Sequence, residues 1–109
     1  MESLVKELGI RYGRNNRTVI SPLELDFWLP DIKYAIEING KCHYEPIYGD
    51  EALAATKARD KRKRAACKAA GIRLRVVKPG DVRNGVCELR FKAVIREIKQ
   101  YIQARAQAD

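Results

Sequence analysis

Two alternating segments on either side of a Pro-Asp turn constrain this chain more than any other feature. In the first segment, residues 23–29, every second side chain is apolar, and the same holds in the second, residues 33–39. A period of two is typical of β-strands, and Pro30-Asp31 between them is a turn signal. We therefore predict an antiparallel hairpin. Its buried face comprises Leu23, Leu25, Phe27 and Leu29 against Tyr34, Ile36 and Ile38.

The other face of this hairpin carries acidic side chains. If the turn centres on residues 31–32, paired residues have numbers that sum to 63, so Asp26 lies opposite Glu37 and Glu24 opposite Asn39. Directly opposed like charges destabilise a strand pair. Departures from good patterning tend to mark functional sites. The alternative is a solvent-exposed face whose carboxylates pair with nearby Lys or Arg.

A divalent cation between Asp26 and Glu37 would remove this conflict. Trp28 and Ala35 continue the acidic face, which predicts that a helix partly covers it. For Trp28 we favour packing under that helix over stacking on a nucleic-acid base. Mg²⁺ takes one or two carboxylates, retained waters and phosphate oxygens, and Mn²⁺ is expected to substitute for it.

Excess positive charge indicates a polyanionic partner. The 109 residues include 22 Lys and Arg against 14 Asp and Glu, a net charge of +8. Residues 57–68 read KARDKRKRAACK and hold seven basic residues against one Asp. We expect this run to be helical and to contact DNA phosphates, although a merely solvated helix face has the same pattern. The candidate DNA-binding residues are Lys41, Lys57, Lys61, Arg62, Lys63 and Arg64.

The remaining chain alternates between helical and extended patterns. We predict helices over 2–8, 50–70 and 86–106, strands over 17–20 and 72–77, a polar connection over 12–16, and loops over 40–49 and 79–85. The order is then α-β-β-β-α-β-α. A hairpin joined through a helix to a further strand implies an α/β fold with a mixed sheet and helices on its faces.

Length and cysteine content indicate one small intracellular domain. We expect residues 1–109 to form a single domain. No apolar run approaches the roughly 20 residues that span a bilayer, and the N-terminus lacks a secretory signal. Three cysteines without a CxxC pair favour reduced thiols. We therefore expect a cytoplasmic protein with no membrane partner.

The run PLELDFWLPDIKYAIEINGKCHYEPIYG resembles the PD-(D/E)XK nuclease superfamily. It is most similar to nucleases related to very-short-patch repair endonucleases and to nuclease domains of phage homing endonucleases. The resemblance covers about residues 18–77 and includes LPD, AIEING, a following His and a basic helix that ends in AGIRLRVV. It implies a restriction-endonuclease-like α-β-β-β-α-β core with an added C-terminal helix. It also implies Mg²⁺-dependent hydrolysis of DNA phosphodiesters, in a bacterial or phage-infected cell.

The resemblance also implies roles for individual residues. Asp26 matches the metal-binding Asp, Glu37 matches the first acidic residue of the ExK element, and the backbone carbonyl of Ile38 would complete the protein's metal ligands. The superfamily often adds a Glu from the N-terminal helix, for which Glu2 and Glu7 are the candidates.

The superfamily's lysine position is occupied by Asn39 here. Asn39 can position water but supplies no positive charge, so the role of the lysine falls to Lys41, Lys57 or another helix lysine. His43 follows the strand as a catalytic His does in the repair-type relatives, where it would act as general base. The alternative for His43 is a loop residue hydrogen-bonded to a neighbour.

These observations lead to a nuclease hypothesis with two rivals. The first hypothesis is an endonuclease that nicks DNA, or cuts both strands as a homodimer; a structure-selective junction resolvase is a variant of it. The second is a non-catalytic DNA-binding module with a degenerate site, supported by Asn39. The third is a basic scaffold without chemistry. Only the nuclease needs Asp26 and Glu37 to share a cation.

Overall fold

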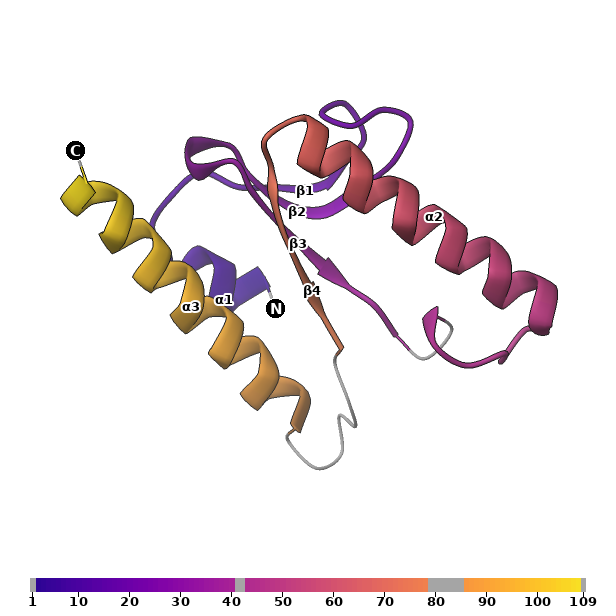
Figure 1. Ribbon diagram of the computed structural model, residues 1–109. Helices are drawn as coiled ribbons and strands as arrows, with labels where there is room; N and C mark the ends of the chain where they lie inside the picture. Colours follow the sequence, from indigo (N-terminus) through magenta and orange to yellow (C-terminus); the bar gives the residue numbers. More distant parts are fainter. Residues whose placement is uncertain (1, 41–42, 79–85, 109) are drawn as a thin grey trace.

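A four-stranded mixed sheet forms the centre of the computed structural model, which describes residues 2–40, 43–78 and 86–108 (Figure 1). The strands are β1 (Gly13–Asn16), β2 (Leu25–Leu29), β3 (Tyr34–Ile38) and β4 (Arg73–Val77), and they lie in that order. The pairs β1–β2 and β2–β3 are antiparallel, whereas β3–β4 is parallel. β1 and β4 are thus the edge strands, and the predicted mixed α/β sheet is confirmed.

Helices cover both faces of this sheet. Helices α1 (Glu2–Lys6) and α3 (Val86–Ala108) pack on one face. The apolar sides of β2 and β3 meet α3 there, as the alternating pattern predicts. The buried residues of this main core are Val5, Phe27, Leu29, Ile32, Tyr34, Ile36, Val77, Val94, Ile95 and Ile98. The apolar stripe of α3 therefore serves the core of this chain.

Helix α2 (Asp50–Ala69) covers the opposite face. Its Cys67 packs with Ala35 and Ile72 in a second, smaller core, against which Trp28 also packs. Helical cover over Trp28 is thus confirmed. Leu25 also belongs to this second core and Leu23 packs against it, so our placement of Leu23 and Leu25 with Phe27 and Leu29 is wrong.

The hairpin has the register that the sequence predicts. Phe27 pairs with Ile36 and Trp28 pairs with Ala35, so the numbers of paired residues sum to 63. A short 3-10 helix, η1 (Pro30–Ile32), forms the turn, and Lys33 follows it with a left-handed φ of 49°. Because the register is fixed, Asp26 and Glu37 lie opposite each other on the face that α2 covers.

The first strand lies earlier in the chain than predicted. We expected a strand over residues 17–20 after a polar connection, but β1 spans Gly13–Asn16. The side chain of Asn16 accepts hydrogen bonds from the backbone N–H of Thr18 (3.1 Å) and of Val19 (3.0 Å). This Asx-type turn occupies N–H groups that a strand would need, so the β-branched run bends away.

The later elements agree with the prediction within a residue or two. α2 begins at Asp50 and ends at Ala69, and Gly71 follows with a φ of 72°, a left-handed conformation that glycine adopts without strain. The predicted loop over 79–85 lies outside the described residues. In the part of the chain that the structure describes, no helix is long and apolar enough to cross a membrane.

Candidate active site

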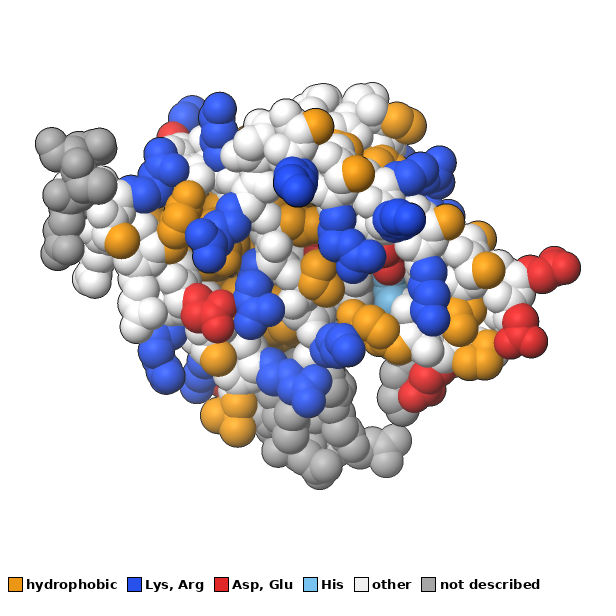
Figure 2. All heavy atoms as spheres, in the orientation of Figure 1, with side chains coloured by type: hydrophobic (Ala, Val, Ile, Leu, Met, Phe, Trp, Pro, Cys, Tyr) orange, Lys and Arg blue, Asp and Glu red, His pale blue; other side chains and the backbone are white. Residues whose placement is uncertain are grey.

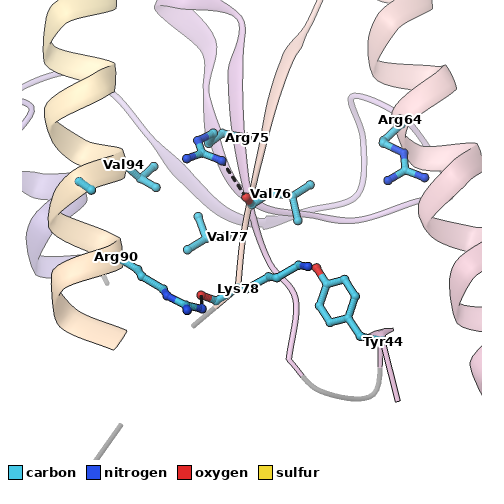
Figure 3. A pocket seen from close by; sticks show the side chains of 9 residues that line it. Tyr44, Arg64, Arg75, Val76, Val77, Lys78, Arg90 and Val94 are labelled. Atoms are coloured by element: carbon cyan, nitrogen blue, oxygen red, sulfur yellow. Dashed lines mark hydrogen bonds between the residues drawn. The ribbon is translucent and has the colours of Figure 1, made fainter. Parts of the chain in front are cut away.

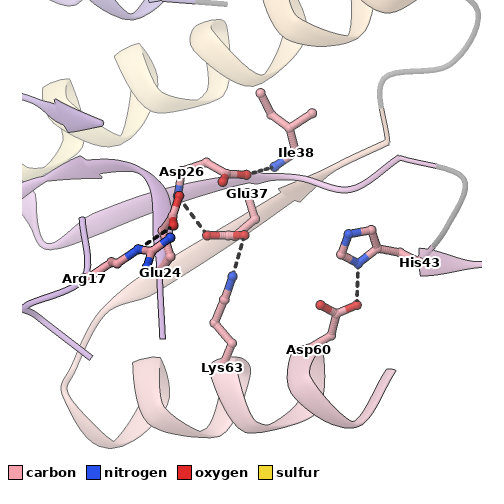
Figure 4. Close-up of polar contacts among 8 residues, drawn as sticks. All are labelled: Arg17, Glu24, Asp26, Glu37, Ile38, His43, Asp60 and Lys63. Carbon is pink, nitrogen blue, oxygen red and sulfur yellow. Dashed lines mark hydrogen bonds and ion pairs between the residues drawn. The ribbon is translucent and has the colours of Figure 1, made fainter. Parts of the chain in front are cut away.

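A polar cleft of about 390 Å³ lies between the β2–β3 hairpin and α2 (Figure 4). It brings together side chains from three separate parts of the chain: the hairpin, the segment after β3, and α2. The lining residues include Glu24, Asp26, Glu37, Ile38, Asn39, His43, Arg59, Asp60 and Lys63. Asp26, Glu37, Ile38, Asn39, His43 and Lys63 are candidate site residues from the sequence.

The carboxylates of Asp26 and Glu37 each bind the backbone of the opposite strand. The backbone N–H of Asp26 donates to Glu37 Oε1 at 3.0 Å, and the N–H of Ile38 donates to Asp26 Oδ2 at 2.8 Å. Beyond the Phe27–Ile36 pair, these side-chain contacts link the two strands. Both carboxylates are therefore held in fixed orientations at the floor of the cleft.

Glu37 is a buried carboxylate in contact with a lysine. Only 4% of Glu37 is exposed, and burial raises its pKa above the ordinary 4.5. The negative charge of Asp26 acts in the same direction, while the hydrogen bond from Lys63 opposes the rise. Lys63 Nζ lies 2.9 Å from Glu37 Oε2, and 14% of the Lys63 side chain is exposed. The net direction of the pKa shift is upward because burial is the largest cause.

Lys63 places a positive charge beside Glu37, on the face of the sheet that also carries Asn39. The basic run of the sequence predicts Lys63 as a DNA-contacting residue, but its ammonium group turns inward to Glu37. Lys57, the helix lysine that we named to supply the charge that Asn39 lacks, is exposed, and Lys41 lies outside the described residues. The signal that could have identified Lys63 is the spacing of Asp60, Lys63 and Cys67, which places all three on the sheet-facing side of α2.

His43 and Asp60 form a pair at the same cleft. His43 Nδ1 lies 2.8 Å from Asp60 Oδ2, and both side chains are largely buried. When the carboxylate accepts from Nδ1–H, the second ring nitrogen, Nε2, is left to accept a proton. The spacing of three residues places Asp60 on the same helix face as Lys63. No local pattern links Asp60 to His43, because that contact crosses 17 residues of chain.

Asn39 is buried beside the two carboxylates. It is 7% exposed, and its backbone N–H donates to the carbonyl of Val77 on β4 at 2.9 Å. This bond fixes the chain directly after β3. The Asn39 amide side chain therefore lies at a defined place in the cleft lining, where it can orient a water molecule or a phosphate oxygen.

The donor set fits a hard divalent cation with retained waters. Among the described residues no group of three or more His, Cys, Asp and Glu side chains converges as a metal cage. Two fixed carboxylates and a backbone carbonyl at Ile38 are oxygen donors, which suit Mg²⁺ when water and phosphate complete the shell. Asp26 lines the cleft, and its second oxygen, Oδ1, makes no hydrogen bond within the described part of the chain.

The two acidic candidates on the N-terminal helix do not reach the cleft. Glu2 accepts hydrogen bonds from Tyr12 Oη (3.0 Å) and Arg14 Nη1 (2.7 Å), and Glu7 lines a separate pocket against α3. Glu2 lies on α1 and Glu7 directly follows it, and α1 packs on the other face of the sheet. The expectation, implied by the resemblance, that Glu2 or Glu7 joins the site is therefore wrong.

The basic residues of α2 divide into two exposed flanks. Lys57, Lys61 and Arg64 follow one another at helical spacings of four and three, so they form one stripe. Arg62 lies on the other flank of the helix. Figure 2 shows Lys and Arg side chains spread across the face that carries α2 and β4.

Taken together, the cleft holds two fixed carboxylates, one of them in contact with a lysine, and a separate His–Asp pair. Such a set can bind a divalent cation, orient water and accept its proton. Comparison with protein-family models, curated proteins and solved structures finds no match for this chain.

Proposed function

We propose that this chain is a Mg²⁺-dependent DNA endonuclease built on a restriction-endonuclease-like core. The observation that carries the proposal is the pair of carboxylates, Asp26 and Glu37, held opposite each other with Lys63 in contact with Glu37. The net charge of +8 supports a nucleic-acid substrate, because it would attract a polyanion to an otherwise acidic cleft.

The cation would be held by Asp26, Glu37 and the carbonyl of Ile38, where it would act as a Lewis acid on the scissile phosphate. Lys63 would place its ammonium group beside the phosphate and compensate for the charge that develops there. Asn39 would hold the attacking water in line. Each of these side chains already lines the cleft, so the proposal requires no large rearrangement.

His43 would take the proton from the attacking water through Nε2. Asp60 holds the ring through Nδ1 and would stabilise the imidazolium that forms. A single site of this kind cuts one strand, so cutting both strands would require a homodimer or two successive events.

One observation favours the rival, a non-catalytic DNA-binding module. The ion pair between Lys63 and Glu37 already compensates for one of the two carboxylate charges without a metal. In such a module Asp26 and Glu37 would serve only to join β2 to β3. Replacing Asp26 by Asn would then leave nucleic-acid binding intact.

The test is nicking of supercoiled plasmid in Mg²⁺ and in EDTA by the wild type, by Asp26→Asn and by Asp31→Asn. Asp31 is the matched control, because it is an exposed carboxylate paired with Arg11 away from the cleft. We expect nicking by the wild type and by Asp31→Asn in Mg²⁺ only, and none by Asp26→Asn. If the wild type nicks neither plasmid nor a four-way DNA junction in Mg²⁺ or Mn²⁺, the nuclease proposal is overturned. Cleavage of the junction alone would identify a structure-selective resolvase.

A further inference from the structure

A second pocket, of about 560 Å³, lies where β4 ends between α2 and α3 (Figure 3). We call it the β4 pocket. Arg64 reaches it from α2, Lys78 from the end of β4, Arg90 from α3, and Tyr44 from the segment after β3. Val76, Val77, Ala93 and Val94 also line it. Arg75 of β4 lines it as well, so four cations, an aromatic ring and an apolar wall surround one space.

The positive charge of this pocket is mostly uncompensated. Arg75 is bound to Glu97 at 2.9 Å, whereas no described carboxylate pairs with Arg64, Lys78 or Arg90. Arg90 is instead oriented by a hydrogen bond from its Nη1 to the carbonyl of Lys78 (2.9 Å). Cations gathered in this way repel one another, and a bound anion would relieve that repulsion.

The rest of the lining indicates a ligand with an aromatic part in addition to an anionic group. Tyr44 is 39% exposed, and Lys78 Nζ lies over its ring, 4.1 Å from the centroid. An aromatic face next to cations is the combination that binds a nucleotide, because the base stacks on the ring while the cations take the phosphate. The volume lies within the range of ordinary small-ligand pockets.

We propose that the β4 pocket binds one unpaired nucleotide of the DNA strand, with its phosphate near Arg64, Lys78 and Arg90 and its base on Tyr44. This inference rests on the proposed function and names its substrate class: DNA with unpaired nucleotides beside the site of cleavage. A base inside a duplex is already stacked on its neighbours, so only an unpaired base can use the Tyr44 ring.

The β4 pocket adjoins the cleft at three points. His43 lines the cleft and the next residue, Tyr44, lines the pocket; the same holds for Lys63 and Arg64 on α2. The third link is the hydrogen bond from the N–H of Asn39, in the cleft, to the carbonyl of Val77, in the pocket. A strand held in the pocket would thus run on into the cleft, and the pocket's cations would offset the repulsion between DNA and the carboxylates.

The test measures binding without cleavage, by fluorescence anisotropy in EDTA with Asp26→Asn as the background. The probes are a short labelled oligothymidylate, a blunt duplex of the same length, and that duplex with a single-stranded tail. We expect Tyr44→Ala to weaken binding of the oligothymidylate and the tailed duplex by roughly five- to a hundredfold, as base stacking predicts. Tyr44→Phe should bind as the background does, and the blunt duplex should be little affected by either change.

Arg90→Gln tests the phosphate contact, with Arg96→Gln as its matched control. Arg96 is an exposed arginine on the same helix that lines a different pocket, with Leu4 and Glu7. We expect Arg90→Gln to lower the slope of log affinity against log salt by about 0.7 on the oligothymidylate, the value for one phosphate contact, and Arg96→Gln to leave it unchanged.

Equal losses on single strand and blunt duplex, or no loss with Tyr44→Ala and Arg90→Gln, would overturn the nucleotide site. The plasmid assay separates this failure from that of the nuclease proposal. If the wild type nicks plasmid but both pocket variants bind DNA as the background does, the nucleotide site is excluded and the nuclease proposal stands. If the variants show the expected loss of binding but the wild type cleaves no DNA, the nucleotide site stands and the DNA-binding module is favoured over the nuclease.

Discussion

At the scale of single residues, Glu37 is the most constrained group in the cleft. One carboxylate oxygen accepts from the backbone of β2 and the other accepts from Lys63. A charge so deeply buried is tolerated only when it is paired and hydrogen-bonded. Its partners therefore determine both the stability of the fold and the readiness of the site for a cation.

Replacing Lys63 by Met tests this dependence. The change leaves the buried Glu37 charge without its partner, so we expect the free energy of unfolding at neutral pH to fall by about 3 kcal/mol. Chemical denaturation measures the change, and Lys61→Met, an exposed lysine on the same helix, should cost less than about 0.5 kcal/mol. Equal stability of the two variants would show that the ion pair contributes nothing.

The raised pKa of Glu37 predicts how stability and Mg²⁺ binding depend on pH. The folded state binds this proton more tightly than the unfolded state, whose pKa is near 4.5, so this group's contribution to stability falls as pH rises from that value through the raised pKa. Mg²⁺ competes with the proton, so its binding should weaken as pH falls through the same window. Thermal unfolding with and without Mg²⁺ at several pH values measures both effects.

Glu37→Gln is the control for that experiment, since the amide keeps an acceptor for the N–H of Asp26 but carries no titrating proton. We expect this variant to lose the Mg²⁺-induced rise in Tm, together with the pH dependence that belongs to Glu37. A variant that responds to Mg²⁺ as the wild type does would exclude Glu37 as a ligand.

At the scale of elements, the sequence predicts best the features that are set by residues close together in the chain. The hairpin register follows from alternation and one turn, and its prediction is confirmed. The strand over 17–20 is wrong because one side chain, that of Asn16, redirects the chain. Lys63 at Glu37 depends on a contact across 26 residues, which no local pattern contains. The site residues of the hairpin are therefore easier to predict from the sequence than the α2 residues that contact them.

Gly71 ends α2 and leads the chain into β4. Its φ of 72° lies in the left-handed region, and a Cβ added there would meet no atom within 4 Å. Gly71→Ala should therefore cost only the conformational strain, about 1 kcal/mol in the free energy of unfolding. Gly13→Ala is the matched control, because Gly13 has equal space without a left-handed φ, and we expect it to be neutral or slightly stabilising. Equal effects of the two changes would contradict the prediction.

At the scale of the whole molecule, positive charge surrounds an acidic cleft. Because Lys57 and Lys61 lie on one exposed stripe of α2, we expect the double change to Gln to weaken DNA binding at low salt. The slope of log affinity against log salt for a blunt duplex should fall by roughly 1.8, about 0.9 for each lost phosphate contact. Lys92 and Lys99, which line the pocket beside α1, provide the control pair. An unchanged slope would exclude the stripe as a DNA contact.

The cleft is divided between the sheet, which provides Asp26 and Glu37, and α2, which provides Asp60 and Lys63. α2 is fastened to the sheet by the small core around Cys67, whose buried thiol has a raised pKa and is unreactive while the helix is docked. Lifting of α2 alone would separate the proposed catalytic residues while the main core, on the other face, persists. Heating should therefore abolish nicking before the sheet melts. In a background with Cys42 and Cys87 replaced by Ser, the labelling rate of Cys67 should rise at the temperature of inactivation.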